Sequence, residues 1–417
     1  MRPAGRDDAR PGRTGGPDGT GAARHTPSVR VLTLTLATLS MIGPFTIDTI
    51  FPGFAQMGAD FEAGPAALQQ VTSVYLLAFA LMSVVHGPLS DALGRRPVML
   101  VGLGGYVVAS AACALAPTLG WLLVGRVVQG LFAGAATIVS RAVIRDLFEG
   151  AEAQRLMSQV MMIFAAAPAL APVVGGWILQ WGPWPWIFWF VGAYGVGAAL
   201  LVVLVLPESL PPQERQPLRL GSVVGGLLHV ARSWAFQRLA LAAAFAMSGY
   251  FVYVVGAPIV VLDLLGLGEQ DFWVLFVPQI GGFVLGSWLT GRLAGRVHER
   301  RLVDAAMGGL VLAVAVNVLI AAVAPSLPWA VVGPTLMGVV IGVVFPLLQL
   351  EMLDLFPRHR GSAASVASFA TLVFNALLAG AIIPLVTASL LTTALASGAL
   401  GLAGAGMWLW HRSVERA

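Results

Sequence analysis

A short polar segment, Gly87-Pro-Leu-Ser-Asp-Ala-Leu-Gly-Arg-Arg-Pro-Val98, separates two long apolar runs of the chain. This arrangement predicts a very short loop between two membrane-spanning helices. Gly94 suits the end of the first helix, because glycine adopts the left-handed backbone that closes a last turn. Arg95 and Arg96 follow at the negative end of that helix dipole, and Pro97 suits the first turn of the next helix.

The composition is that of a membrane protein. Of the 417 residues, 58% are hydrophobic and 11% are charged, whereas a soluble domain carries about 25% charged residues. All 24 basic residues other than histidine are arginine, so the lysine of a Walker A phosphate loop is missing. The single cysteine, Cys113, cannot form a disulfide within the chain, which argues against redox chemistry. This lysine-free, Ala-, Gly- and Arg-rich usage suggests a bacterial genome of high GC content.

Twelve apolar runs follow a polar N-terminal segment, residues 1–28, which holds almost no large apolar side chain and is expected to be disordered. Each run is near the about 20 residues that span a bilayer. The expected spans are 30–57, 67–90, 98–116, 119–145, 156–180, 184–206, 235–263, 269–292, 302–323, 328–353, 362–387 and 389–410.

The arginines give the topology. With both termini on the cytoplasmic side, every arginine except Arg126 falls in a terminal segment, in an inner loop or at an inner helix end. The outer loops carry acids instead, namely Asp60, Glu62, Glu269 and Asp271. A missed or invented helix would scramble this alternation, so the positive-inside rule supports the orientation and the helix count together. We expect a multi-pass protein of the bacterial cytoplasmic membrane.

The longest internal loop, residues 207–234, divides the chain into two sets of six spans, 29–206 and 235–411, before a short tail at 412–417. Part of this linker could form a helix on the inner surface. The halves echo one another, because Asp91-x-x-Gly94-Arg95 recurs as Arg292-x-x-Gly295-Arg296 at the end of the second helix of each half. Parallel halves of this kind are typical of transporters.

Asp48 is the acid expected deepest in the membrane. It lies 18 residues after Arg30, or roughly 27 Å along a helix, and Pro52-Gly53 follows within about a turn and should bend the helix. An ionisable group in hydrocarbon needs a partner, water or a function. One interpretation is a titratable carboxylate in a cavity that binds a proton or a cationic ligand. The alternative is an aspartate at the outer interface of a long helix.

Arg126 begins the segment Arg126-Val-Val-Gln129-Gly in the fourth span. Its guanidinium must be hydrogen-bonded, and the expected partners are Gln129 or carbonyls of the first helix freed near Pro52. We interpret it as a group that tunes the protonation of Asp48. The alternative is that the side chain snorkels to the outer surface.

Two further groups of residues suggest moving parts. An ion pair from Arg95 to Asp146 would join the second and fourth spans at the inner face as a latch, although Asp146 could equally be a solvated loop acid. The expected gating loop and latch comprise Gly87, Asp91, Gly94, Arg95, Arg96 and Asp146. Small residues and prolines in the fifth span, Pro168, Pro172, Gly175 and Gly176, suit a hinge, or only a kinked helix.

The candidate substrate-cavity residues are Phe45, Tyr250, Phe251, Tyr253 and Gln279, although ordinary packing explains the aromatic residues equally well. The six histidines are expected at helix ends or in loops, so no metal site is predicted. No nucleophile lies near a plausible base, and no enzyme activity, cofactor or nucleic-acid partner is expected. We expect a monomer in the lipid bilayer.

Several of these motifs resemble the major facilitator superfamily, and in particular the Bcr/CflA branch of its twelve-helix drug:H+ antiporters. The resemblance rests on Gly87 to Val98, Arg126-Val-Val-Gln-Gly130, Ala171-Pro-Val-Val-Gly-Gly176, Ile47-Asp-Thr-Ile-Phe-Pro52, Trp186-Ile-Phe-Trp189, Pro207-Glu-Ser-Leu-Pro-Pro212 and Leu353-Asp-Leu-Phe-Pro357. It implies two six-helix bundles with alternating access, and proton-driven export of small drugs. It also implies that Asp48 and Arg126 serve substrate and proton, and that Asp91, Arg95 and Asp146 form the inner latch.

The expected mechanism is exchange, in which ionised Asp48 attracts an amphipathic drug and protonation from outside favours its release. One carboxylate cannot serve both ligands, so their binding is antagonistic and reciprocal. The alternatives are export or symport of an endogenous metabolite or sugar and, from another class, a transport-inactive membrane sensor or scaffold. The absence of a folded soluble domain in the sequence argues against the sensor.

Overall fold

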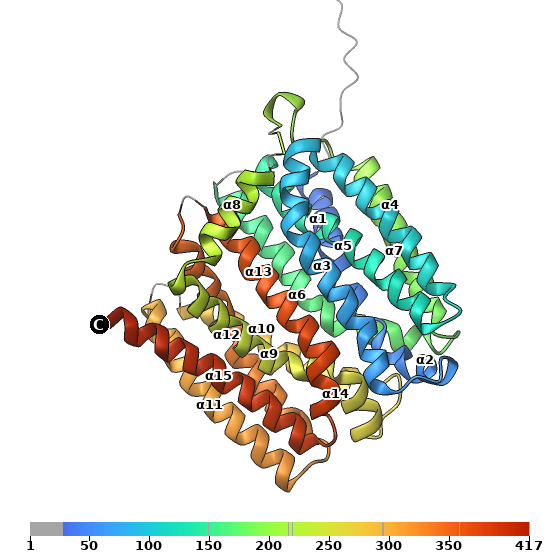
Figure 1. Cartoon of the computed structure of the whole chain (residues 1–417), viewed down its shortest axis with the longest axis vertical. Helices are drawn as coiled ribbons and strands as arrows, with labels where there is room; N and C mark the ends of the chain where they lie inside the picture. The colour runs from blue at the N-terminus through green and yellow to red at the C-terminus, as the bar shows by residue number, and fades with distance from the viewer. Residues whose placement is uncertain are drawn as a thin grey trace, which may run out of the picture.

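The computed structural model describes residues 28–148, 150–215, 217–218, 220–293, 296–357 and 359–416, and the described part is helical throughout (Figure 1). The first half contains α1 (Val29–Asp48), η1 (Phe51–Gly53), α2 (Phe54–Asp60), α3 (Pro65–Leu93), α4 (Arg95–Ala114), α5 (Leu119–Leu147), α6 (Gly150–Ile178) and α7 (Pro185–Leu204). The linker contains η2 (Pro212–Glu214) and α8 (Leu220–Ala231).

The second half begins at α9 (Trp234–Val255), which continues into a π-helical turn, η3 (Ile259–Leu264). The helices that follow are α10 (Trp273–Leu293), α11 (Glu299–Val323), η4 (Trp329–Val331), α12 (Val332–Asp354), α13 (Arg360–Leu377), the π-helical η5 (Leu378–Ile382), α14 (Ile383–Val386) and α15 (Leu390–Arg416).

The prediction of twelve spans in two bundles is confirmed. Eleven segments of the described chain are long and apolar enough to cross a membrane. The twelfth span is α6, a helix of 29 residues whose described apolar part is Ala167–Ile178. The first span consists of three successive helical segments, α1, η1 and α2. The helix is therefore interrupted at Pro52, where the sequence predicts a bend.

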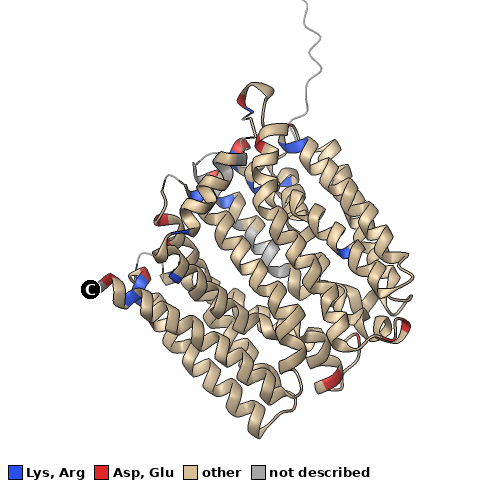
Figure 2. Ribbon diagram, viewed as in Figure 1, with Lys and Arg blue, Asp and Glu red and all other residues tan. Residues whose placement is uncertain are grey.

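The two ends of the bundle differ in charge. One end, which we call the basic end, carries Arg95, Arg145, Arg300 and Arg412, whereas the other, which we call the acidic end, carries Asp60, Glu62 and Glu269. Figure 2 shows most of the basic residues, with some acidic ones among them, along the edge near α8 and the C-terminus, while the edge near α2 shows acidic residues. This separation follows from the alternation of basic and acidic loops along the chain.

The halves meet along two pairs of helices. In the first half α3 packs on α5, α4 on α7 and α1 on α6, while in the second half α10 packs on α12 and α9 on α15. Between the halves, α3 runs against α13, and α6 touches α10. The linker helix α8 packs against α13 of the second half. This contact lies near the basic end (Figure 2).

The segment Gly87 to Val98 is even tighter than predicted. The helix α3 continues through Pro88 to Leu93, and Gly94 alone separates it from α4. Gly94 has φ 101° and ψ 153°, a conformation that is essentially restricted to glycine. A Cβ atom there would lie 2.7 Å from Nη2 of Arg215 and 2.8 Å from Oε2 of Glu208.

Glu208, in the linker, caps the start of α4. Its carboxylate accepts the backbone N–H of Arg95 at 2.9 Å and that of Arg96 at 3.2 Å. These are free donors of a helix N-terminus, where a negative charge is favourable. The linker thus fixes the turn between α3 and α4, an interaction between residues more than a hundred positions apart that the local sequence pattern did not reveal.

We predict that Gly94→Ala destabilises the protein by about 1–3 kcal/mol, because alanine must adopt a glycine-only conformation and push Glu208 away. Thermal unfolding of the purified protein in detergent measures the effect. The matched control is Gly87→Ala, since a Cβ atom at Gly87 meets nothing within 4 Å. An equal loss of Tm in both variants would contradict the tight turn.

Candidate functional site

The first helix is interrupted directly after Asp48. α1 ends at this residue, and Pro52 lacks the N–H that would bind the carbonyl of Asp48 four residues earlier. The interruption is packed against α6, because a Cβ atom at Gly175 would overlap the backbone oxygen of Thr49. Pro52 therefore frees the backbone around Asp48, and Gly175 lets α6 cover it.

The Asp48 side chain is buried at the interface between the two halves, which we call the seam. It is 2% exposed, and its Oδ1 atom has no hydrogen-bond partner among the described residues. Its charge interacts with Tyr75 of α3 and with Tyr250 of α9, which belongs to the other half. This burial argues against an aspartate that is solvated at the outer interface. An unpaired carboxylate at this depth needs a proton, water or a ligand.

Arg126 of α5 is completely buried, so it does not snorkel. Its Nε donates to the carbonyl of Val71 at 3.0 Å, and its Nη1 donates to Oε1 of Gln129 at 2.6 Å and to the carbonyl of Thr46 at 3.5 Å. The guanidinium carbon also lies 4.2 Å from the ring centroid of Tyr75, which is a cation–π contact. Arg126 thus joins α1, α3 and α5, and its contacts with Gln129 and with a carbonyl of the first helix are those expected from the sequence.

Further hydrogen bonds fix the groups around Arg126. Gln129 donates from Nε2 to the hydroxyl of Ser110 at 2.8 Å, and the hydroxyls of Thr46 and Tyr106 lie 2.6 Å apart. Both partners come from α4, so α4 is joined to α5 and α1. Such a connected network holds a buried cation in a defined position.

Asp48 and Arg126 form no ion pair with one another in the described structure. Nε and Nη1 of Arg126 donate to other groups, and its Nη2 has no hydrogen-bond partner among the described residues. Tyr75 interacts electrostatically with both charges. The Asp48 carboxylate can therefore accept a proton or a cationic group without first breaking a salt bridge. The influence of Arg126 on the protonation of Asp48 stays a prediction.

Of the other cavity candidates, some lie near Asp48 and some do not. Gln279 of α10 lies beside Tyr250, because its Nε2 donates to the Tyr250 carbonyl at 3.0 Å. Phe45, three residues before Asp48, stacks on Tyr194 of α7 with ring centroids 5.7 Å apart. These three candidates lie near Asp48 in space or in sequence. Phe251 is half-buried and packs against the hydrophobic core.

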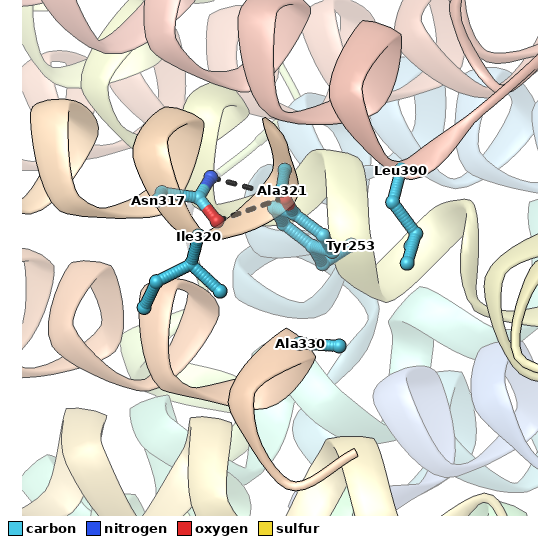
Figure 3. A pocket seen from close by; sticks show the side chains of 6 residues that line it. All are labelled: Tyr253, Asn317, Ile320, Ala321, Ala330 and Leu390. Carbon is cyan, nitrogen blue, oxygen red and sulfur yellow. Dashed lines mark hydrogen bonds between the residues drawn. The ribbon is translucent and has the colours of Figure 1, made fainter. Parts of the chain in front are cut away.

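Tyr253, the remaining cavity candidate, is hydrogen-bonded to α11, and its role in substrate binding stays a prediction. Its hydroxyl exchanges hydrogen bonds with the side-chain amide of Asn317 in α11, at 3.1 Å to Oδ1 and 3.0 Å to Nδ2 (Figure 3). Together they line a small cavity within the second half, with Ala330 and Leu390 also in its wall. Tyr253 therefore faces α11 and belongs to a different polar cluster from Tyr250.

At the basic end, Arg95 joins three elements. Its Nε donates to Oδ2 of Asp146 at 2.9 Å, and its Nη1 donates to Oδ1 of Asp91 and to the hydroxyl of Ser90. Ser209 of the linker also donates to Asp146, at 2.8 Å. The pair between Arg95 and Asp146 is thus present, although its action as a latch stays a prediction. Arg96, the neighbouring member of this group, donates to the carbonyl of Val203 at the end of α7.

At the acidic end, side-chain hydrogen bonds connect the two halves. Among the described residues, four side-chain hydrogen bonds cross between the halves, and all four lie towards this end of the bundle. They join Gln56 to Glu269, Gln69 to the carbonyl of Val255, Gln70 to that of Gly380, and Ser73 to that of Ala376. Because all these contacts lie at one end, the structure represents a state closed at the acidic end.

The glycines of α6 take part in this closure. α6 remains continuous through Pro168 and Pro172, and the hinge predicted there stays a prediction. A Cβ atom at Gly176 would overlap the carbonyl oxygen of Glu269, in the loop before α10. The close approach of the two halves at the acidic end therefore requires glycine at this position.

Two histidines differ from the expectation. His86 lies inside α3, 3% exposed, and packs against Gly134 of α5. His411 is buried near Glu351 and Glu415, and the three ligand atoms lie within 4.8 Å of one another. Arg300 forms ion pairs with both glutamates, 3.3 Å from Glu351 and 3.0 Å from Glu415, so we interpret this group as an ion-pair network at the basic end.

Several polar residues of the site were not predicted from the sequence, above all those of α3. Gln69, Thr72 and Tyr75 are three residues apart, and all three are buried. This spacing places them along one side of a helix that is otherwise largely apolar. A scan for polar positions at helical spacing inside the spans, rather than for charges alone, would have found them. The hydrogen bond between Thr46 and Tyr106 depends on how α1 packs against α4, and the sequence of a single helix does not indicate such a contact.

The comparisons with known proteins agree with this architecture. Residues 36–384 match the model of the Major Facilitator Superfamily. The chain is 33% identical over 297 residues to YdgK, an uncharacterized MFS-type transporter of Bacillus subtilis, covering 70% of this chain and 74% of the relative. It is 30% identical over 284 residues to a bicyclomycin resistance protein homolog of Haemophilus influenzae, covering 67% and 70%.

Similarity extends to other transporters. The multidrug resistance protein MdtL of Salmonella heidelberg is 28% identical over 282 residues, covering 66% of this chain and 71% of the relative. A crystal structure of a D-xylose-proton symporter superimposes with a TM-score of 0.70 at 16% identity, covering 92% of this chain and 98% of that one. An inward-facing, occupied bacterial homolog of the lysosomal transporter Spinster gives 0.69 at 17% identity, covering 93% and 98%. The chain therefore belongs to the major facilitator superfamily and is a multi-pass membrane transporter rather than an enzyme.

Proposed function

We propose that the protein exports small amphipathic drugs or antibiotics in exchange for protons. The observation that carries this proposal is the buried Asp48, whose Oδ1 atom has no partner among the described residues although it lies at the seam between the halves. The names of the Haemophilus influenzae and Salmonella heidelberg relatives, which refer to bicyclomycin and multidrug resistance, support a drug as the substrate.

Coupling follows from competition for one carboxylate. Ionised Asp48 attracts a cationic or hydrogen-bonding drug, and the proton that neutralises it removes this attraction. Because each ligand weakens the binding of the other by the same factor, a proton gradient can drive the drug in the opposite direction. Arg126 serves this exchange by holding α1, α3 and α5 in a fixed arrangement around the carboxylate.

The two ends of the bundle supply the alternating access. In the proposed orientation, the basic end and both termini face the cytoplasm, so the observed state is closed towards the outside. Drug would enter from the cytoplasm in this state. Opening of the acidic end would require the four hydrogen bonds between the halves to break, and the ion pairs around Arg95 would govern closure of the basic end. The substrate, protons and lipid are the expected partners of a monomer.

We predict that Asp48→Asn abolishes proton-coupled export while leaving expression and thermal stability near those of the parent, since asparagine keeps the shape but cannot exchange a proton. A susceptibility panel in an efflux-deficient bacterial host finds the substrates, and uptake into everted vesicles on imposing a pH gradient measures coupling. Asp48→Glu is the matched control and should keep part of the activity. Undiminished export by Asp48→Asn would refute the assignment.

In the same vesicles, reversing the pH gradient distinguishes antiport from symport, and ligand binding without transport would favour the sensor.

Closure at the acidic end can be tested with Gly176→Leu. The added side chain would overlap the Glu269 backbone and hold the halves apart there, so we expect export to fall at least about tenfold, the effect of roughly 1.4 kcal/mol against the closed state. A cysteine introduced by Ser73→Cys should then react faster with a membrane-impermeant maleimide from outside. Gly281→Leu in α10 is the control, because a Cβ atom at Gly281 meets nothing within 4 Å. Unchanged labelling in Gly176→Leu would count against this closure.

The closure should also depend on external pH. Burial raises the pKa of Glu269 in the closed state, and the hydrogen bond from Gln56 offsets only part of this effect. A carboxyl group whose pKa is higher in the closed than in the open state favours closure when it is protonated. Labelling of Ser73→Cys should therefore slow as the external pH falls through the raised pKa of Glu269. Because maleimide reacts with the thiolate, labelling of any cysteine slows as the pH falls, so Ser73→Cys in the Glu269→Gln background supplies the reference rate at each pH. A ratio of the two rates that does not change with external pH would assign the closure to another group.

A further inference from the structure

We infer that the site selects its ligands by the N–H and O–H groups they carry, through acceptor oxygens that both halves supply. This inference rests on the proposed transport function and specifies its substrate class. The ligand expected is an amphipathic ammonium with free N–H groups, in preference to a quaternary ammonium or an anion.

Two buried glutamines provide the first acceptors. Gln69 of α3 and Gln279 of α10 are both fully buried. Each donates its amide nitrogen to a backbone carbonyl of α9, Gln69 to Val255 at 3.2 Å and Gln279 to Tyr250 at 3.0 Å. A carbonyl only accepts, so these bonds fix which end of each amide is nitrogen. Both Oε1 atoms remain without a hydrogen-bond partner among the described residues.

Two more acceptors belong to the same group. The Oδ1 atoms of Asp48 in α1 and Asn375 in α13 are also buried and lack a partner within the described chain. Together with the glutamines they come from two helices of each half. A buried acceptor without a partner is costly, and water or a ligand must supply the missing donor. A ligand that displaces water here without bringing donors of its own would lose those bonds.

The contacts around these four acceptors place them in one region. Asp48 interacts with Tyr250, the residue whose carbonyl receives the Gln279 amide. On the opposite side of the seam, Ser73 of α3 donates to the carbonyl of Ala376, the residue after Asn375. Gln69 lies one helical turn before Ser73. The four acceptors therefore lie along the interface between the two halves, on α1 and α3 of the first half and on α10 and α13 of the second.

The charges of the region favour the same ligand class. The ionised Asp48 attracts a cation, and the neighbouring amide oxygens present the negative ends of their dipoles. An anionic ligand would meet these acceptors with lone pairs of its own and would have to rely on Nη2 of Arg126 and on the hydroxyls of Thr72 and Ser248, which also lack a partner among the described residues. Arg126 is fully buried in the first half and already holds three helices, so we assign it to the framework of the site.

A methylation series tests the inference directly. The probes are 2-naphthylmethylammonium and its N,N-dimethyl and N,N,N-trimethyl derivatives, which are all cations at neutral pH and carry three, one and no N–H groups. If apolar burial and charge alone governed binding, each added methyl group would raise the affinity. Acceptor recognition predicts the opposite order, with Kd increasing at least about tenfold from the primary to the trimethyl probe. Calorimetry or naphthalene fluorescence with the purified full-length protein measures Kd.

Gln279→Met keeps the length of the side chain and removes the acceptor, so the ratio of the two extreme Kd values should fall several-fold. Gln213→Met in the exposed linker is the matched control and should keep the parent ratio. Equal affinities across the series, affinities that rise with methylation, no binding of any probe, or an unchanged ratio in Gln279→Met would each overturn the inference. Failure of the proposed function looks different. The parent would then bind the probes in the expected order but would not move them against a proton gradient in proteoliposomes.

Discussion

The first half of the protein is organised around one buried cation. A guanidinium inside a membrane bundle needs hydrogen-bond partners. Arg126 donates to Thr46 of α1, Val71 of α3 and Gln129 of its own helix, while its Nη2 atom has no partner among the described residues. These bonds fix three helices relative to one another at the depth where α1 is interrupted. The position of Asp48 at the seam follows, because α1 cannot rotate without releasing the arginine.

The two ends of the molecule use different kinds of interaction. At the basic end, charged side chains join elements within each half, as Arg95 does with Asp146 and Arg300 does with Glu351. At the acidic end, three neutral side chains of α3 donate to backbone carbonyls of the other half, and Gln56 of α2 donates to the Glu269 carboxylate. Neutral hydrogen bonds are weaker than those of buried charges, so the acidic end can exchange its bonds for water at modest cost. This difference suits a framework that stays intact within each half while the halves move.

The sequence was sufficient for the fold because hydrophobic runs and arginine placement report directly on the membrane. It also placed Asp48 and Arg126 at depth, since charges are conspicuous in apolar helices. It did not indicate that Tyr253 faces α11, because a span that is apolar on most sides gives no clue to which face meets a partner helix. The cap supplied by Glu208 depends on a contact across the whole first half, and no local pattern encodes that.

The π-helical turns η3 and η5 give the acidic end one further property. Each follows a long helix of the second half. The carbonyl of Gly380, within η5, accepts from Gln70, and that of Val255, four residues before η3 begins, accepts from Gln69. A π turn holds one more residue than an α turn. Rewinding it would shift the register of the adjoining helix and withdraw the accepting carbonyl at the same time. A local change of helical winding in the second half would thus break its hydrogen bonds to the first half.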